Sequence, residues 1–89
     1  MLQTPMGSEQ SQQVLEFIIS GHYILTHHAY LRMQERAITD GDIRECARTA
    51  IKIEPQDGGK FRIQGLDLSE EETTIVCALS NNVVIITVF

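Results

Sequence analysis

The sequence predicts an α+β fold, with two to three N-terminal helices packed on one face of an antiparallel sheet of about four strands. Apolar residues recur at helical spacing in the first half of the chain and at every second position in the second half. The 89 residues suffice for one core about two layers thick. We therefore expect a single α+β domain over residues 11–89, preceded by a flexible N-terminus over residues 1–10. Either Met1 or Met6 could be the natural start.

Residues 11–20 carry the first helical pattern, with apolar side chains on one side. Gly21 can take the left-handed conformation that ends many helices, and it is predicted to end this one. A short extended link over residues 22–25 follows. Thr26 is a predicted N-cap, because its hydroxyl can accept a hydrogen bond from the first turn of a helix over residues 28–37.

The third helix is predicted over residues 40–50 and has the clearest helical periodicity in the chain. Thr39 is its expected N-cap, and Asp42 stands where a capping box usually has Glu or Gln. In the second helix, the spacing of the apolar residues predicts that Tyr30 lies on the core side.

Alternation of apolar and polar residues replaces helical spacing after residue 50. The turn-forming residues Pro55 to Gly59 separate two short strands and predict a hairpin with one buried and one solvent-facing side. The last strand is apolar at nearly every position, which is typical of a central strand. The predicted strands are residues 51–54, 60–65, 72–79 and 83–89.

The composition limits the classes of function. A net charge of −5 argues against non-specific nucleic-acid binding, which requires a broad positive field, but it permits a local basic patch. Cys46 and Cys77 stand at apolar positions, so we expect two buried free thiols in a reducing cytoplasm rather than a disulfide. The sequence has no zinc-ligand spacing, membrane span or signal peptide, and it predicts no metal, no cofactor and no membrane contact.

Two stretches of sequence carry a family resemblance. The first comprises Thr26-His27-His28-Ala29, Arg32-Met33, Glu35-Arg36, Ile38-Thr39 and Asp42-Ile43. The second comprises Gly59-Lys60-Phe61-Arg62-Ile63, Gly65, Asp67, Thr74-Ile75-Val76 and residues 84–88. In this order they resemble the small bacterial domains of unknown function of family 4258 (DUF4258), over about residues 23–89.

That family is similar to compact toxin folds of the BrnT, RelE and MqsR kind, which are mRNA-cleaving ribonucleases neutralised by a cognate antitoxin. The resemblance implies a toxin-like domain that binds RNA or the ribosome and cleaves RNA without a metal. It also implies a cognate antitoxin-type protein as a partner. Similar folds host different functions, so an RNA-cleaving activity does not follow from the fold alone. It is an expectation that depends on the residues of the site.

The resemblance places a candidate site on the second helix and the hairpin. His28 would be the catalytic base or acid, because histidine titrates near neutral pH. Arg32 follows four residues later on the same side of the helix and is assigned to catalysis with it. Arg36, Lys60 and Arg62 would bind phosphate or another anion, a task to which a guanidinium fork is well suited.

Each of these residues also has a structural interpretation. His28 could bond a neighbouring carbonyl or carboxylate, and His27 differs from it only in its match to the family's His-Ala step. The arginines could pair with nearby acids, and Lys60 could be an ordinary outward residue of a hairpin. Nucleases of the RelE type often rely on a tyrosine or basic residue near the C-terminal strand, whereas this strand ends at Phe89.

Two other functions therefore stay open. One is a non-catalytic protein-binding or regulatory module that holds an acidic peptide with the same cations. The other is a homodimer whose subunits pair through the sheet or the first helix, and whose chemistry the sequence does not reveal.

Overall fold

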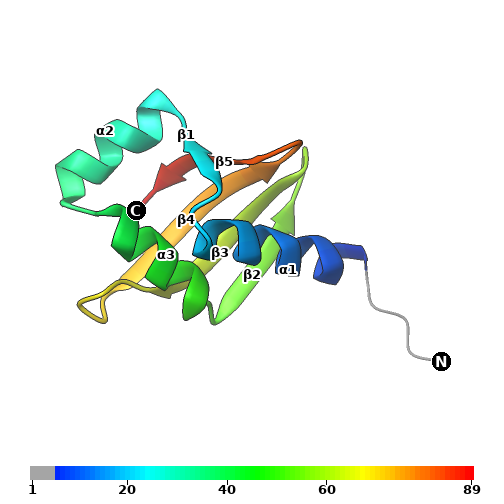
Figure 1. The fold of residues 1–89 in the computed structure, drawn as a ribbon, viewed down its shortest axis with the longest axis horizontal. Coiled ribbons are helices and arrows are strands. Elements are labelled where there is room, and N and C mark those ends of the chain that lie inside the picture. The colour runs from blue at the N-terminus through cyan, green and yellow to red at the C-terminus, as the bar shows by residue number, and fades with distance from the viewer. Residues whose placement is uncertain (1–5) are drawn as a thin grey trace.

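The computed structural model describes residues 6–89 and contains three helices and five strands. In chain order these are α1 (Met6–Ile19), β1 (Tyr23–Leu25), α2 (His27–Arg36), α3 (Asp40–Arg48), β2 (Lys52–Gln56), β3 (Lys60–Leu66), β4 (Glu72–Leu79) and β5 (Val83–Val88). The strands form one sheet in the order β1-β5-β4-β3-β2. Figure 1 shows α1 and α3 lying across one face of the sheet, with α2 to the side, next to β5.

The predicted α+β class is confirmed, but the sheet is mixed and has a fifth strand. Residues 22–25, predicted as a link, contain β1, which pairs in parallel with β5 through Tyr23–Val83 and Leu25–Ile85. The other three strand pairs are antiparallel. A strand of three residues leaves no alternation to detect, and its partner lies far away in the sequence, so no local pattern could have revealed the pairing.

The helix boundaries are close to the predicted ones, except at the first helix. α1 begins at Met6 rather than at residue 11. The predicted flexible N-terminus, residues 1–10, therefore overlaps this helix, and its first five residues lie outside the described part of the chain. Gly21 has a φ of 82°, which is the left-handed conformation predicted for the end of α1.

Both predicted N-caps are present. The Thr26 hydroxyl accepts a hydrogen bond from the Ala29 amide at 3.0 Å and donates to the Ile86 carbonyl at 2.9 Å. It therefore caps α2 and ties the helix to β5. At α3, the Thr39 hydroxyl accepts from the Asp42 amide, and the Asp42 carboxylate accepts from the Thr39 amide, which completes a capping box.

The core lies between the sheet and the helices. Alternate residues of β3 and β4 are buried on this side, and α1 and α3 contribute the opposing layer. Its largest fully buried side chains are Ile18, Ile43, Ile63, Ile75 and Ile85. Cys46 and Cys77 are buried free thiols, as predicted, and burial raises the pKa of each to about 12.

Helix α3 approaches β3 very closely at Gly65. A β-carbon built on Gly65 would lie 2.1 Å from the carbonyl oxygen of Cys46, which no side chain can tolerate. The Cys46 thiol also donates to the Thr73 carbonyl of β4, at 3.3 Å. The glycine in β3 thus sets the distance between the helix layer and the sheet.

The prediction that Tyr30 is a core residue is wrong. Tyr30 is 48% exposed, and its hydroxyl accepts a hydrogen bond from Gln34 on the next turn of α2. Only Ala29 and Met33 of this helix are buried. Helix α2 packs on the edge of the sheet beside β5, so its apolar contact is narrower than that of a helix lying across a sheet.

The three described helices leave the second face of the sheet open, and we call it the open face. The register identifies the residues of the open face. They alternate along each strand with the buried residues, and they pair with one another across the strands. Its residues on the four antiparallel strands include Lys52, Glu54, Gln56, Lys60, Arg62, Gln64, Leu66, Glu72, Thr74, Val76, Ala78 and Val84.

Candidate functional site

Arg32 lies where β1 ends and the edge of β5 becomes free. The Val88 carbonyl on that edge accepts a hydrogen bond from Nε of Arg32 at 3.4 Å. The guanidinium also lies 3.9 Å from the carboxylate of Glu35, one turn along α2. Together with Thr26, which bonds the Ile86 carbonyl, Arg32 covers the part of β5 that β1 leaves unpaired. Its contacts in the structure are therefore structural ones.

Arg36 lies at the other end of α2, beside the last residue of the chain. It lines a hollow of about 350 Å³ together with Phe89. The remaining lining residues are Ile38, Asp67, Glu71, Glu72 and Thr73. Three of these carry carboxylates, so the hollow around Arg36 is acidic, and a phosphate inside it would be repelled.

Arg62 lies on the open face, and its guanidinium is stacked on an aromatic ring. The central carbon of the guanidinium is 5.6 Å from the centre of the Phe89 ring, a cation–π distance. Lys60 is two residues away on the same face and is exposed. Phe89 thus connects Arg62 to the hollow that contains Arg36, while Lys60 extends the positive charge along β3.

His28 lies in the first turn of α2, where its side chain is exposed and its ring makes no hydrogen bond to another described residue. It is eight residues from Arg36, or about 12 Å along a helix. His27 is equally exposed. The structure therefore brings Arg36 and Arg62 together around Phe89, places Lys60 two residues from Arg62, and separates His28 from Arg36 along α2.

The two sides of α2 point toward the two sides of the sheet. Tyr30 and Gln34 line a hollow with Asp40, the first residue of α3. Arg36 instead lines a hollow with Phe89, which belongs to the open face because its backbone pairs with Thr74 through hydrogen bonds of 2.7 and 2.9 Å. His28 and Arg32 precede Arg36 at intervals of four residues, and this helical spacing places them on the same flank of α2.

Charge is divided unequally between these two sides. We define the basic side as the open face together with the second flank of α2. It holds five of the seven lysines and arginines but three of the twelve acidic residues, with Asp67 and Glu71 at its border, where they line the hollow of Arg36 and Phe89. The cations are Arg32, Arg36, Lys52, Lys60 and Arg62, and the acids are Glu35, Glu54 and Glu72. The net charge of −5 is thus produced by the helix side and the turns.

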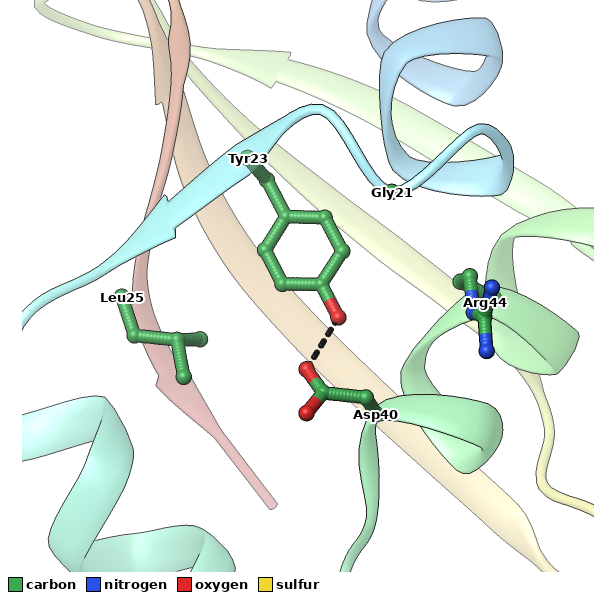
Figure 2. Close-up of a pocket in the computed structure, with 5 residues that line it drawn as sticks. All are labelled: Gly21, Tyr23, Leu25, Asp40 and Arg44. Atoms are coloured by element: carbon green, nitrogen blue, oxygen red, sulfur yellow. Dashed lines mark hydrogen bonds between the residues drawn. The ribbon is translucent and has the colours of Figure 1, made fainter.

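The sequence did not predict a further hollow, which lies on the helix side of the sheet. The Tyr23 hydroxyl donates a hydrogen bond to the Asp40 carboxylate (Figure 2). Both residues line a hollow of about 400 Å³, and Arg44 is another of its lining residues. Burial and this bond both raise the pKa of Tyr23, so the hydroxyl stays protonated. Because the bond joins β1 to the start of α3, it is a structural contact. Tyr23 was hidden in the supposed link.

The described residues contain no cluster of three or more histidines, cysteines or carboxylates able to hold a metal ion. No helix of residues 6–89 combines the length and the apolar character needed to cross a membrane.

Comparison with known proteins identifies the family. The family model described as Domain of unknown function (DUF4258) matches residues 25–89, so the chain belongs to that family. The resemblance found in the sequence is thereby confirmed at the level of the family. No curated protein and no solved structure matches the chain. The further likeness to toxin folds stays a prediction.

Proposed function

We propose that this member of the DUF4258 family binds RNA through its basic side. The observation that carries the proposal is the separation of charge between the two sides of the sheet. A phosphate backbone responds to the local field of the surface that it approaches, so a net negative chain can bind RNA through one positive surface.

Two features of the basic side favour a nucleic acid over a small anion. Its cations are distributed over α2, β2 and β3, which suits a polymer with many phosphates rather than one compact ion. Two of them carry no carboxylate partner: Lys60 has no ion pair with another described residue, and Arg62 contacts Phe89. Lys52 lies 3.4 Å from the Glu54 carboxylate and Arg32 lies 3.9 Å from the Glu35 carboxylate. The charge of Lys60 and Arg62 is therefore the most available to a ligand.

The proposal covers binding and leaves cleavage to experiment. Cleavage without a metal needs a base and an acid close to the same phosphate. His28 lies about 12 Å along α2 from Arg36, and Arg32 is bonded to the Val88 carbonyl. The histidine is thus separated along α2 from Arg36, the cation nearest to the Arg62–Phe89 stack on this helix.

The test uses a fluorescein-labelled single-stranded RNA of twelve nucleotides and measures its anisotropy with the purified full chain. Lys60→Ala with Arg62→Ala removes two charges from the basic side. Arg44→Ala with Arg48→Ala removes the same charge from the helix side and is the matched control. We expect the first pair to weaken binding about tenfold or more at low salt and to flatten the salt dependence, because fewer counterions are released. We expect the control to change binding less than twofold.

Equal losses in the two double variants would overturn the proposal, because binding would then follow net charge alone. Competition by poly-glutamate as effective as competition by RNA of equal charge would point instead to an acidic protein partner. Gel analysis of the same RNA, with the wild type and with His28→Ala, detects any cleavage that depends on the histidine.

A further inference from the structure

The stacked pair formed by Arg62 and Phe89 is presented on the open face of the sheet. Phe89 reaches it because its backbone pairs with Thr74, which places both side chains on that face. Arg62 lies on the neighbouring strand, opposite Val76, and its guanidinium extends across β4 to the ring. Phe89 is 37% exposed, so the stack is accessible from solvent.

Beside the stack, the open face carries two polar side chains whose hydrogen-bonding groups are available to a ligand. Thr74 and Gln64 are paired across β4 and β3, next to the stack. In the described part of the chain, neither side chain makes a hydrogen bond within the protein. A flat ligand lying on the stack would therefore meet a hydroxyl and an amide at its edge, both able to donate and accept.

The neighbouring hollow limits what kind of group can bind there. Phe89 also lines the hollow with Asp67, Glu71 and Glu72, whose carboxylates repel phosphate. Carboxylates accept hydrogen bonds from amino groups, however, and adenine, cytosine and guanine each carry one. The ring side of the stack thus suits a base, while the phosphates lie toward Lys60 and Arg62.

We infer that the Arg62–Phe89 stack holds an unpaired base, so that the RNA bound by the basic side is single-stranded. This inference rests on the proposed function. A base in a duplex is already stacked and paired, whereas an unpaired base can lie on an aromatic ring or on a guanidinium plane. The carboxylates of the hollow further favour cytosine over uracil, because only cytosine has an amino group at the base edge.

The experiment compares five probes of similar length with the full chain: single-stranded RNA, the same RNA as a duplex, inorganic polyphosphate, oligo(C) and oligo(U). Polyphosphate has the charge but no bases, so it separates stacking from phosphate binding. We expect single-stranded RNA to bind roughly tenfold tighter than the duplex, and oligo(C) to bind tighter than oligo(U).

The key variant is Phe89→Leu, which keeps an apolar side chain but removes the ring. Relative to its affinity for polyphosphate, its affinity for single-stranded RNA should fall roughly fivefold or more. Phe89→Tyr keeps a ring and should bind as the wild type does. Urea unfolding of both variants shows whether the domain remains folded.

The possible failures are distinguishable. If no probe binds, the proposed function fails and the inference fails with it. If polyphosphate, duplex and single strand bind equally well, or if Phe89→Leu binds RNA like the wild type, the basic side binds phosphate but the stack does not hold a base. Equal binding of oligo(C) and oligo(U) would overturn the role given to the carboxylates.

Discussion

On the helix side of the sheet, Arg48 is held by the Glu45 carboxylate through three hydrogen bonds of 2.8 to 3.1 Å. On the basic side, Lys60 has no ion pair with another described residue, and Arg62 is stacked on a ring. Both sides carry arginine on regular elements of the same small domain. Arg48 therefore differs from Lys60 and Arg62 in that the fold has already supplied it with an anionic partner, as it has supplied Lys52 with Glu54 and Arg32 with Glu35.

The difference is informative because partnered and unpartnered charges have different consequences. Charges that the fold has paired limit the conformations of the chain and attract ligands weakly, because their field is cancelled locally. Among the side chains that the structure describes, no buried nitrogen or oxygen lacks a hydrogen-bond partner. Cations left without partners on an acidic domain are therefore the better candidates for function. Substitutions on the helix side should change stability, and those on the basic side should change binding.

The largest expected effect is on the helix side, at Gly65. In Gly65→Ala the new methyl would overlap the Cys46 carbonyl, so α3 must move away from β3. We expect a loss of about 3 kcal/mol or more in the free energy of unfolding, as for severe overpacking of a core. Urea denaturation followed by circular dichroism measures it. A loss below about 1 kcal/mol would mean that the helix layer is more loosely attached than the close approach suggests.

The second prediction concerns Asp42, which joins the start of α3 to the turn after β3. Its carboxylate accepts hydrogen bonds from the amides of Thr39 and Leu68, at 2.9 and 3.0 Å. We expect Asp42→Ala to lower the free energy of unfolding by about 1 kcal/mol near neutral pH, as loss of a helix cap does.

The effect of Asp42→Ala should depend on pH. The Thr39 amide, followed by the Leu68 amide, holds the pKa of Asp42 below its ordinary value of 3.8 in the folded state. A carboxyl with a lowered pKa stabilises the fold above its unfolded value and loses that contribution as the pH falls through the folded value. The wild type and the variant should therefore converge in stability below about pH 4. A difference that stayed constant down to pH 2 would show that the carboxylate charge is not the cause.

The smallest expected effect is at Arg32, a basic-side residue that the fold ties to the edge of β5. Arg32→Ala removes a long hydrogen bond to the Val88 carbonyl and an exposed contact with Glu35. We expect a stability loss below about 1 kcal/mol, and a smaller loss of RNA binding than in Arg62→Ala. Parallel urea and anisotropy measurements on the two variants test this order. If Arg32→Ala abolished binding at unchanged stability, the division between structural and functional arginines would be wrong.

Local features of the fold were predictable from the sequence because each has a local physical cause. The caps at Thr26 and Thr39 depend on hydroxyls within three residues of the amides that they accept from. The hairpin of β2 and β3 follows from alternation interrupted by turn residues. The parallel pairing of β1 depends on a strand far along the chain, and the exposure of Tyr30 depends on where α2 sits beside the sheet. Neither the pairing of β1 nor the exposure of Tyr30 is indicated by a pattern in the neighbouring residues of the sequence.

The candidate site stays a prediction, but the placement of its residues can be compared with the structure. Helical spacing indicated His28 and Arg32 on one side of the second helix, and the structure has both residues on α2 at that spacing. Phe89 links Arg36 to Arg62. The sequence had drawn attention to Phe89 only because it stands where a nuclease of the RelE type often has a tyrosine or basic residue. Its stacking contact crosses β4, and contacts between strands that are not neighbours in sequence require the register of the whole sheet.

The parallel pairing of β1 with β5 also affects the order in which the domain can fold. Residues 23–25 cannot pair until residues 83–85 are in place. Closing the long loop between these two segments is slower and entropically costlier than forming the hairpin of β2 and β3. During synthesis, the helices and β1 emerge long before β5 does. The first strand of this sheet in chain order is therefore among the last to be paired, and until then its backbone edge stays open to other chains.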